Sequence, residues 1–347
     1  MSVTFAVRDD VPLAPLTTLE LGGPARHLVE ARDEATALEA LRWASARGLR
    51  VLVLGGGSNL VIGDGGFDGL VLRMATRGLT FAPPDAAGEV LATVAAGEPW
   101  DAFVAETVAR GLAGLECLSG IPGLAGATPI QNVGAYGQEV AETIRAVRAV
   151  ERATGALVDL SPADCAFAYR DSAFRRASGR WLVLGVTFAL RAGGAPTLRY
   201  RELAEALAGA APTLSETRAA VLALRARKSM VIDPSDPNRR SAGSFFTNPI
   251  VDAAVADGLG ADAPRWPAGP GRVKLSAGWL IEHAGIAKGT RRGAVGVSTR
   301  HALALVHHGG GSTAELVALA RAVRAAVAAK FGVTLAPEPV FVGASLD

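Results

Sequence analysis

Residues 121–137 form a segment that is rich in glycine and also contains several large apolar side chains. Ordinary loops do not show this combination. The segment reads IPGLAGATPIQNVGAYG, with four glycines and two prolines, and it has the period of neither a helix nor a strand. Surface loops of this composition seldom carry Ile121, Leu124 and Ile130, so the backbone is expected to wrap against a large flat ligand. A packed glycine-rich connection without a ligand explains the pattern equally well.

A second glycine turn, Gly55-Gly56-Gly57-Ser58-Asn59, directly follows the apolar run VLVL. Its unhindered backbone N–H groups suit the close approach of a pyrophosphate. The turn lacks the later glycine of a dinucleotide-binding fingerprint and the Lys-Ser/Thr of a P-loop, and residues 60–62 continue as a strand. Taken alone, it predicts only a tight turn.

Length and charge limit the class of protein. A chain of 347 residues exceeds one hydrophobic core, so two or three compact units are expected. The 35 basic residues against 33 acidic ones supply no field for a nucleic-acid backbone, and charges interrupt every apolar run before it can cross a bilayer. The Arg239-Arg240 and Arg291-Arg292 pairs are interpreted as solvated loops.

The few cysteines and histidines favour a reducing compartment. They also give no sign of a metal site in the protein. Cys117 and Cys165 stand in contexts typical of core filling, which favours a cytoplasmic setting over a disulfide. The N-terminus places charges where a secretory signal is apolar. Neither His-x-x-x-His nor Cys-x-x-Cys occurs, so no metal is expected.

Periodicity and turn residues predict a mixed order of helices and strands. Thr154-Gly155 is expected to turn between two strands, Ser161-Pro162 to open a helical turn capped by Asp164, and the loop IDPSDPNRRS to mark a domain boundary. The predicted helices are residues 35–48, 100–109, 213–227 and 312–330. The predicted strands are residues 51–54, 60–62, 144–160 around the turn, 181–190 and 333–343.

The two glycine segments together resemble the UDP-N-acetylenolpyruvoylglucosamine reductase family, whose pattern is GxGSN followed by IPGxxGxxPIQNxGAYG. The likeness spans nearly the whole chain through TTLELGGPA, AYRDSAF, SAGSFFTNP, VKLSAGWLIEHAG and PEPVFVG. It implies an α+β fold with an FAD-binding domain of the vanillyl-alcohol-oxidase/PCMH type in two lobes, plus a C-terminal α+β substrate-binding domain. The expected boundaries are residues 1–73 (completed by 331–347) for the first flavin lobe, 74–228 for the second and 229–330 for the substrate domain.

The resemblance further implies noncovalent FAD, because neither loop has the histidine that tethers flavin in related proteins. NADPH is the implied hydride donor, and the product is UDP-N-acetylmuramate, made from the enolpyruvyl ether of a nucleotide sugar for peptidoglycan. The implied cofactor-binding residues are Gly55, Gly56, Gly57, Ser58, Asn59, Ile121, Pro122, Gly123, Gly126, Ala127, Gln131, Asn132, Gly134, Ala135 and Tyr136.

Three residues match the family's catalytic positions: Arg170, Ser244 and Glu338. A planar guanidinium suits a substrate carboxylate, a positioned serine hydroxyl can deliver a proton, and the two prolines around Glu338 restrict its backbone. The residues that match substrate positions are Tyr200, Arg225, Lys228, Asn248 and Lys274. Without the resemblance, a salt bridge to Asp171 or another acid would explain Arg170, and a buried turn would explain Ser244. A solvated acid would explain Glu338, and an exposed helix end would explain the Arg225/Lys228 pair.

Two residues depart from the family pattern. Thr17 stands where the family usually has Asn, which touches the flavin contact, and His307 stands where Asn is common, in what is expected to be a turn. The expected partner is a small nucleotide sugar, with no nucleic acid and no membrane, and the chain is expected to be a monomer. An FAD oxidase acting on another alcohol and a non-catalytic nucleotide-sugar binding protein remain as alternatives.

Overall fold

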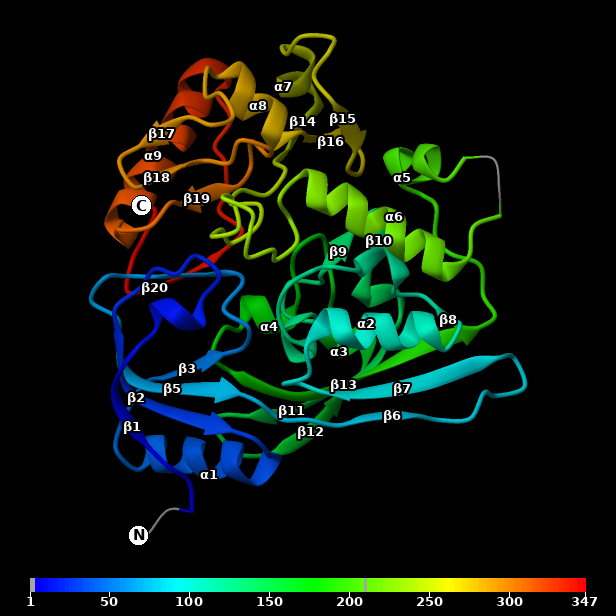
Figure 1. Cartoon of the computed structure of the whole chain (residues 1–347), viewed down its shortest axis with the longest axis vertical. Helices are drawn as coiled ribbons and strands as arrows, with labels where there is room; N and C mark the ends of the chain where they lie inside the picture. Colours follow the sequence, from blue (N-terminus) through cyan, green and yellow to red (C-terminus); the bar gives the residue numbers. More distant parts are fainter. Residues whose placement is uncertain (1–3, 209–210) are drawn as a thin grey trace. The chain divides into compact units, whose positions relative to one another are not determined.

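The computed structural model of the chain describes residues 4–208 and 211–347 (Figure 1). Residues 1–3 of the predicted first flavin lobe and residues 209–210 of the second lie outside the described residues. The described chain forms two compact units. Unit 1 comprises residues 4–11, 25–56, 68–208 and 211–227, and unit 2 comprises residues 12–24, 57–67 and 228–347. The three-lobe division stays a prediction.

The first sheet of unit 1 is four-stranded, and one helix packs an alanine-lined face against it. The strand order is β1 (Arg8–Pro12), β2 (Pro24–Ala31), β5 (Phe67–Met74) and β3 (Val51–Leu54), with β3 parallel to β5. Helix α1 (Glu34–Ser45) begins where the Asp33 carboxylate accepts from the Thr36 N–H at 2.7 Å. Its buried face is Ala37, Ala40 and Ala44, at the spacing that lets a helix lie close to a sheet.

The second sheet of unit 1 is six-stranded and antiparallel around the long strand β13 (Trp181–Ala192) (Figure 1). Its other strands are β12 (Leu157–Leu160), β11 (Ile144–Glu151), β7 (Glu89–Ala95), β6 (Leu79–Phe81) and β8 (Leu112–Ala113). Helix α2 (Trp100–Ala109) contributes Trp100 and Phe103, whose ring centroids lie 5.4–5.8 Å from each other and from Phe188 of β13. The indole N–H of the buried Trp100 donates to the Leu118 carbonyl at 3.1 Å. The polar group of this aromatic cluster is therefore hydrogen-bonded.

The remaining elements of unit 1 are short, apart from one helix. They are β9 (Gly134–Ala135), β10 (Gln138–Glu139), α3 (Pro162–Cys165), α4 (Ala173–Arg176), α5 (Arg201–Ala206), α6 (Leu214–Arg227) and the 3₁₀ turns Glu116–Leu118, Ala125–Ala127 and Val140–Glu142. The glycine-rich segment 121–137 is therefore almost wholly irregular, as expected from its composition.

Unit 2 has two three-stranded antiparallel sheets and one parallel pair. The sheets are β14 (Ile250–Asp252), β16 (Arg272–Leu275), β15 (Arg265–Pro267), and β17 (Arg291–Arg292), β18 (Val295–Val297), β19 (Leu305–His307). The parallel pair joins β4 (Leu60–Ile62) to β20 (Val340–Val342). The other elements are the 3₁₀ turn Ala14–Leu16, α7 (Ala253–Asp257), α8 (Ala277–His283) and α9 (Thr313–Phe331).

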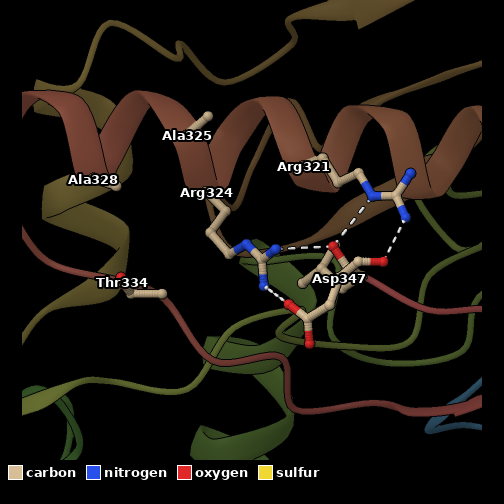
Figure 2. A pocket seen from close by; sticks show the side chains of 7 residues that line it. Arg321, Arg324, Ala325, Ala328, Thr334 and Asp347 are labelled. Atoms are coloured by element: carbon tan, nitrogen blue, oxygen red, sulfur yellow. Dashed lines mark hydrogen bonds and ion pairs between the residues drawn. The ribbon is translucent and has the colours of Figure 1, made fainter.

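Helix α9 is capped at its start and holds the end of the chain along its side. Ser312 and Glu315 form a reciprocal capping box at the first turn. Arg321 Nε donates to the Leu346 carbonyl at 3.1 Å, and Arg324 Nη1 pairs with Asp347 at 2.7 Å (Figure 2). These two arginines line a cavity together with small side chains of the same helix.

The predicted helices and strands are confirmed except at the C-terminal strand and at the end of the first helix, which ends at Ser45 and not at Gly48. Residues 100–109, 162–165 and 214–227 are helical, and the Thr154-Gly155 turn joins β11 to β12. The predicted strand over 333–343 is wrong in length, because only Val340–Val342 is paired as a strand. Pro337 and Pro339 have no N–H to donate to a ladder, so regular pairing cannot begin before them.

The two cysteines fill the core as predicted, but one arginine pair does not lie in a solvated loop. Cys117 and Cys165 are buried and unbridged, and burial raises the pKa of each thiol to about 12. Arg239 and Arg240 are instead half-buried and pair with one carboxylate, that of Glu20. The interpretation of this pair as part of a solvated loop is therefore wrong. Folding of unit 2 places Glu20 beside Arg239 and Arg240, and the spacing of these residues in the sequence gives no sign of that contact.

No helix in the described ranges has the length and apolarity needed to span a bilayer. The same residues hold no group of three or more histidine, cysteine, aspartate or glutamate side chains arranged for a metal ion.

Candidate active site

Gly55 and Gly56 of the first predicted flavin loop lie beside the second predicted loop in unit 1. A Cβ atom added to Gly56 would lie 2.7 Å from the Cα atom of Gly123, and one added to Gly55 would lie 3.7 Å from the Leu124 side chain. The first contact is closer than real Cβ atoms approach a backbone. Glycine at position 56 is therefore a requirement of the packing between the loops, which the sequence pattern alone did not determine.

Backbone donors of the first loop are available to a ligand. Within the described part of the chain, the N–H groups of Gly55, Gly56 and Gly57 donate no hydrogen bond, although Gly57 is buried. Gly57 has a φ of +64°, the left-handed conformation that turns successive N–H groups toward one side. Such a set of donors fits the negatively charged diphosphate of FAD.

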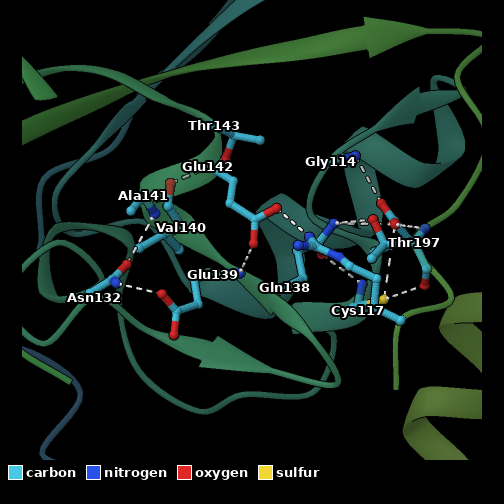
Figure 3. A network of polar contacts seen from close by, with 12 residues as sticks. Gly114, Cys117, Asn132, Gln138, Glu139, Val140, Ala141, Glu142, Thr143 and Thr197 are labelled. Carbon is cyan, nitrogen blue, oxygen red and sulfur yellow. Dashed lines mark hydrogen bonds and ion pairs between the residues drawn. The ribbon is translucent and has the colours of Figure 1, made fainter. Parts of the chain in front are cut away.

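The second loop is held in place by the side chain of Asn132, whose own backbone has a φ of +44°. Its amide nitrogen donates to Glu139 Oε2 at 2.8 Å and to the Ala168 carbonyl at 3.1 Å, and its oxygen accepts from the Ala141 N–H at 3.1 Å (Figure 3). Asn132 is only 1% exposed. Its amide is therefore used to hold the loop, and direct contact between Asn132 and FAD stays a prediction.

A buried carboxylate that sequence reasoning missed, Glu116, ties this loop to the segment before Tyr200. Its two oxygens accept from the Gly114 N–H and the Thr197 N–H, each at 2.8 Å, and from the Gln138 amide at 3.2 Å (Figure 3). Glu116 is fully buried. The signal in the sequence was an acid inside the apolar run GLECL, since a buried charge requires such partners.

Arg170 lies against the second flavin loop. Its Nη2 donates to the Gly134 carbonyl at 2.6 Å, and its own carbonyl accepts from Arg175 at 3.0 Å. Its φ of +52° is unusual for a long side chain. Asp171, one of the acids considered as an alternative partner of Arg170, forms an ion pair with Arg176. Unit 1 thus brings the predicted catalytic arginine to the predicted cofactor loop.

Tyr136, Tyr200 and Arg225 form a second group in unit 1. The two tyrosine rings meet edge to face with centroids 5.2 Å apart. Burial raises the pKa of Tyr136 to about 12 and lowers that of Arg225. The interpretation of Arg225 as an exposed helix end is therefore wrong, and Tyr200, 39% exposed, is the member of the group that faces solvent.

Ser244 and Glu338 lie on adjoining segments of unit 2. The Glu338 N–H donates to the carbonyl of Phe245 at 3.0 Å, one residue beyond Ser244, and Phe246 bridges to Pro337. Asn59 holds the other side, since the Val340 N–H donates to its carbonyl at 3.0 Å. A main-chain hydrogen bond thus joins two segments of unit 2 that are almost a hundred positions apart in the sequence.

Three further predicted substrate residues belong to unit 2. Asn248 Oδ1 accepts from the Ala277 N–H at 2.9 Å, which satisfies a donor at the start of α8. Lys274 pairs in register with Ile250, and its Nζ lies 5.8 Å from the ring centroid of Trp266. Lys228 directly follows α6. The roles of these residues toward a substrate stay predictions.

Both departures from the family pattern have defined contacts. Thr17 is buried, and its hydroxyl lies 3.1 Å from the Ala14 carbonyl and 3.2 Å from that of Leu21. The Gly311 N–H donates to Nε2 of His307, so the ring proton is on Nδ1, which donates to the Leu19 carbonyl at 3.0 Å. His307 therefore holds the turn at 308–311 through both of its ring nitrogens.

The adjoining glycine loops and their backbone donors define a flavoprotein. Residues 25–161 match the family model described as FAD binding domain, and the fold that contains this domain is α+β. Residues 234–342 match the model described as UDP-N-acetylenolpyruvoylglucosamine reductase, C-terminal domain.

Similar proteins extend this likeness to nearly the full length. The UDP-N-acetylenolpyruvoylglucosamine reductase of Saccharopolyspora erythraea is 53% identical over 96% of this chain and 95% of its own, and that of Streptomyces coelicolor is 53% identical over 97% and 90%. The crystal structure of the reductase from Thermus caldophilus superposes with a TM-score of 0.68 at 26% identity, covering 97% of this chain and 99% of that one. The chain belongs to the UDP-N-acetylenolpyruvoylglucosamine reductase family.

Replacing Gly56 with alanine is expected to weaken FAD binding by roughly tenfold to a hundredfold, because the added Cβ forces the two loops apart. Titration of the apoprotein with FAD, followed by quenching of flavin fluorescence, measures the change in Kd. The matched control is Gly65→Ala, whose Cβ would meet no atom within 4 Å. Equal Kd values for the two variants would contradict the prediction.

Proposed function

We propose that this chain reduces the enolpyruvyl ether of UDP-N-acetyl-3-O-(1-carboxyvinyl)-glucosamine to UDP-N-acetylmuramate in peptidoglycan precursor synthesis, with NADPH as the hydride donor. The observation that carries the proposal is the near full-length identity of about half the residues to reductases of that name. The two glycine loops, the first of which has backbone donors available at Gly55–Gly57, support a cofactor site of the kind this chemistry needs.

FAD, when held by the two glycine loops, would supply the hydride of NADPH to the terminal alkene carbon of the substrate. Negative charge then develops on the carbon conjugated to the substrate carboxylate. Arg170 is the cation that stabilises this charge, since a guanidinium can donate two parallel hydrogen bonds to a carboxylate. Its fixed contact with the Gly134 carbonyl supports this role, because a pre-oriented donor costs little reorganisation during the reaction.

Ser244 donates the proton that completes the reduction. A serine hydroxyl is a weak acid, so it serves only when the acceptor is strongly basic and the hydroxyl is held in hydrogen-bond reach. Glu338 assists at the same carboxylate-bearing carbon, with its backbone set by Pro337 and Pro339. The hydrogen bond from Glu338 N–H to the Phe245 carbonyl supports a joint role for the two residues.

The nucleotide part of the substrate is read by Tyr200, Arg225, Lys228, Asn248 and Lys274. The edge-to-face contact between Tyr200 and Tyr136 supports a tyrosine able to cover a ligand, since its ring remains partly exposed. The enzyme is proposed to act as a cytoplasmic monomer in three lobes with the boundaries predicted from the sequence.

The visible spectrum of the purified protein tests the proposal. FAD-loaded protein is expected to show the oxidised flavin bands, to lose them on addition of NADPH without oxygen, and to regain them on addition of the enolpyruvyl sugar. Oxygen consumption on addition of a candidate alcohol would favour an oxidase instead. Protein that binds the sugar but takes up no FAD would contradict the proposal.

A further inference from the structure

One carboxylate in unit 2, that of Glu20, holds two successive arginines. Its Oε1 contacts Nη1 of Arg239, and its Oε2 contacts Nε of Arg240. The three side chains are between 28% and 33% exposed, so the ion pairs are partly shielded from water. We refer to Glu20, Arg239 and Arg240 as the Glu20 clamp.

The backbone at Glu20 is held in an unfavourable conformation. Its φ is +52°, in the left-handed region that favours glycine, and its N–H closes a turn onto the Thr17 carbonyl at 3.2 Å. Glycine follows two residues later in the sequence, but not at position 20. A side chain that persists in such a conformation needs contacts that outweigh the strain, and the two ion pairs are such contacts.

The clamp holds the segment that leads to Ser244. The carbonyl of Arg240 accepts from the His307 N–H at 2.9 Å, and the carbonyl of Ser241 accepts from the Thr18 hydroxyl at 2.6 Å. Thr18 is two residues from Glu20, so one short turn contacts residues 239–241 through both side chains. This fixes the chain upstream of the serine.

The chain is also fixed just downstream of the serine. The Phe245 N–H donates to the Leu303 carbonyl at 2.7 Å, and the Phe245 and Phe246 rings are buried with centroids 5.3 Å apart. Gly243, directly before Ser244, has a φ of +72° and open space where a Cβ would stand. The serine thus lies between two anchored points, joined to the upstream one by a permissive glycine.

We propose that Glu20 is a positioning residue for Ser244: through Arg239 and Arg240 it fixes the upstream end of the serine-bearing turn, and so sets where the hydroxyl can deliver its proton. The inference rests on the proposed role of Ser244. Because a serine hydroxyl is a poor acid, the rate of its proton transfer depends on placement more than on acidity, and loss of an anchor four residues away is felt there.

The test compares the two half-reactions of FAD-loaded Glu20→Gln protein by stopped-flow absorbance. Bleaching by NADPH is expected to stay within about twofold of the wild-type rate, because that step needs no proton from Ser244. Reoxidation by the enolpyruvyl sugar is expected to slow by roughly tenfold to a hundredfold. The matched control is Glu30→Gln, since Glu30 also bridges two arginines, Arg32 at 2.9 Å and Arg73 at 3.1 Å, but in unit 1.

A second variant, Glu20→Gly, separates positioning from folding. Glycine adopts a φ of +52° without strain, so the turn is expected to fold while the clamp is lost. The same selective loss of reoxidation, with a Tm near that of the wild type, would support the inference. An equal loss in both half-reactions, or the same loss in Glu30→Gln, would overturn it.

Ser244→Ala, measured in parallel, distinguishes the two levels of failure. Slow reoxidation in Ser244→Ala together with wild-type reoxidation in both Glu20 variants would overturn the inference alone. Wild-type reoxidation in Ser244→Ala would remove the proposed proton donor, and the positioning role would fall with it.

Discussion

Replacement of Arg170 by lysine is expected to leave FAD binding unchanged while turnover falls by roughly a hundredfold to a thousandfold. Lysine keeps the positive charge but replaces the planar fork by a single nitrogen on a flexible stem. Arg170 already uses Nη2 for the Gly134 carbonyl at 2.6 Å. One ammonium group cannot keep that contact and also meet a carboxylate in the guanidinium geometry, so stabilisation of the developing charge is lost.

Steady-state kinetics with the enolpyruvyl sugar, beside an FAD titration of each protein, measure this effect. The matched control is Arg176→Lys, because Arg176 belongs to the same segment and pairs with Asp171 rather than with the cofactor loop. Turnover of the Arg170 variant equal to that of the control would remove Arg170 from the catalytic residues. Parallel loss of FAD affinity would indicate that Arg170 supports the Gly134 loop instead.

Replacement of Ser244 by alanine is expected to leave bleaching of the flavin by NADPH intact and to slow its reoxidation by the enolpyruvyl sugar by roughly a hundredfold or more. The hydroxyl is needed only after hydride has reached the substrate, when a carbanionic carbon must be protonated. Loss of the donor leaves water as the proton source, and water is not held in the same position.

Stopped-flow measurement of the two half-reactions separates these steps. Ser235→Ala is the control, because Ser235 is exposed and its hydroxyl donates only to Asp233, at 2.7 Å, among the described residues. Reoxidation of the Ser244 variant at the rate of the control would exclude Ser244 as the donor. Slow bleaching in both variants would point to impaired FAD binding and not to proton transfer.

Local secondary structure was largely predictable because its signals lie within a few residues. The capping pair Ser312 and Glu315 marked the start of α9, and Ser161 with Asp164 marked α3. The error at residues 333–343 arose where apolar residues suggested a strand, while the two prolines removed the donors that a ladder needs.

A candidate site residue could be predicted where its type fits a recognisable motif. It could not be predicted where its role depends on a partner side chain that is distant in the sequence. Arg239 and Arg240 look like a solvated basic pair, because nothing nearby in the sequence indicates Glu20. Arg225 looks like an exposed helix end, although its surroundings bury it and lower its pKa. Both errors share one cause, since burial is a property of the packed chain.

The sequence by itself determined the family, the two glycine turns and the candidate side chains, because these depend on residue identity and short spacing. Only the tertiary structure decided that Gly56 must be glycine against Gly123, that Arg170 is directed to the Gly134 carbonyl and that the Phe245 carbonyl receives the Glu338 N–H. Each of these is a contact between segments distant in the chain. Such contacts follow from how the chain packs, which local propensity does not encode.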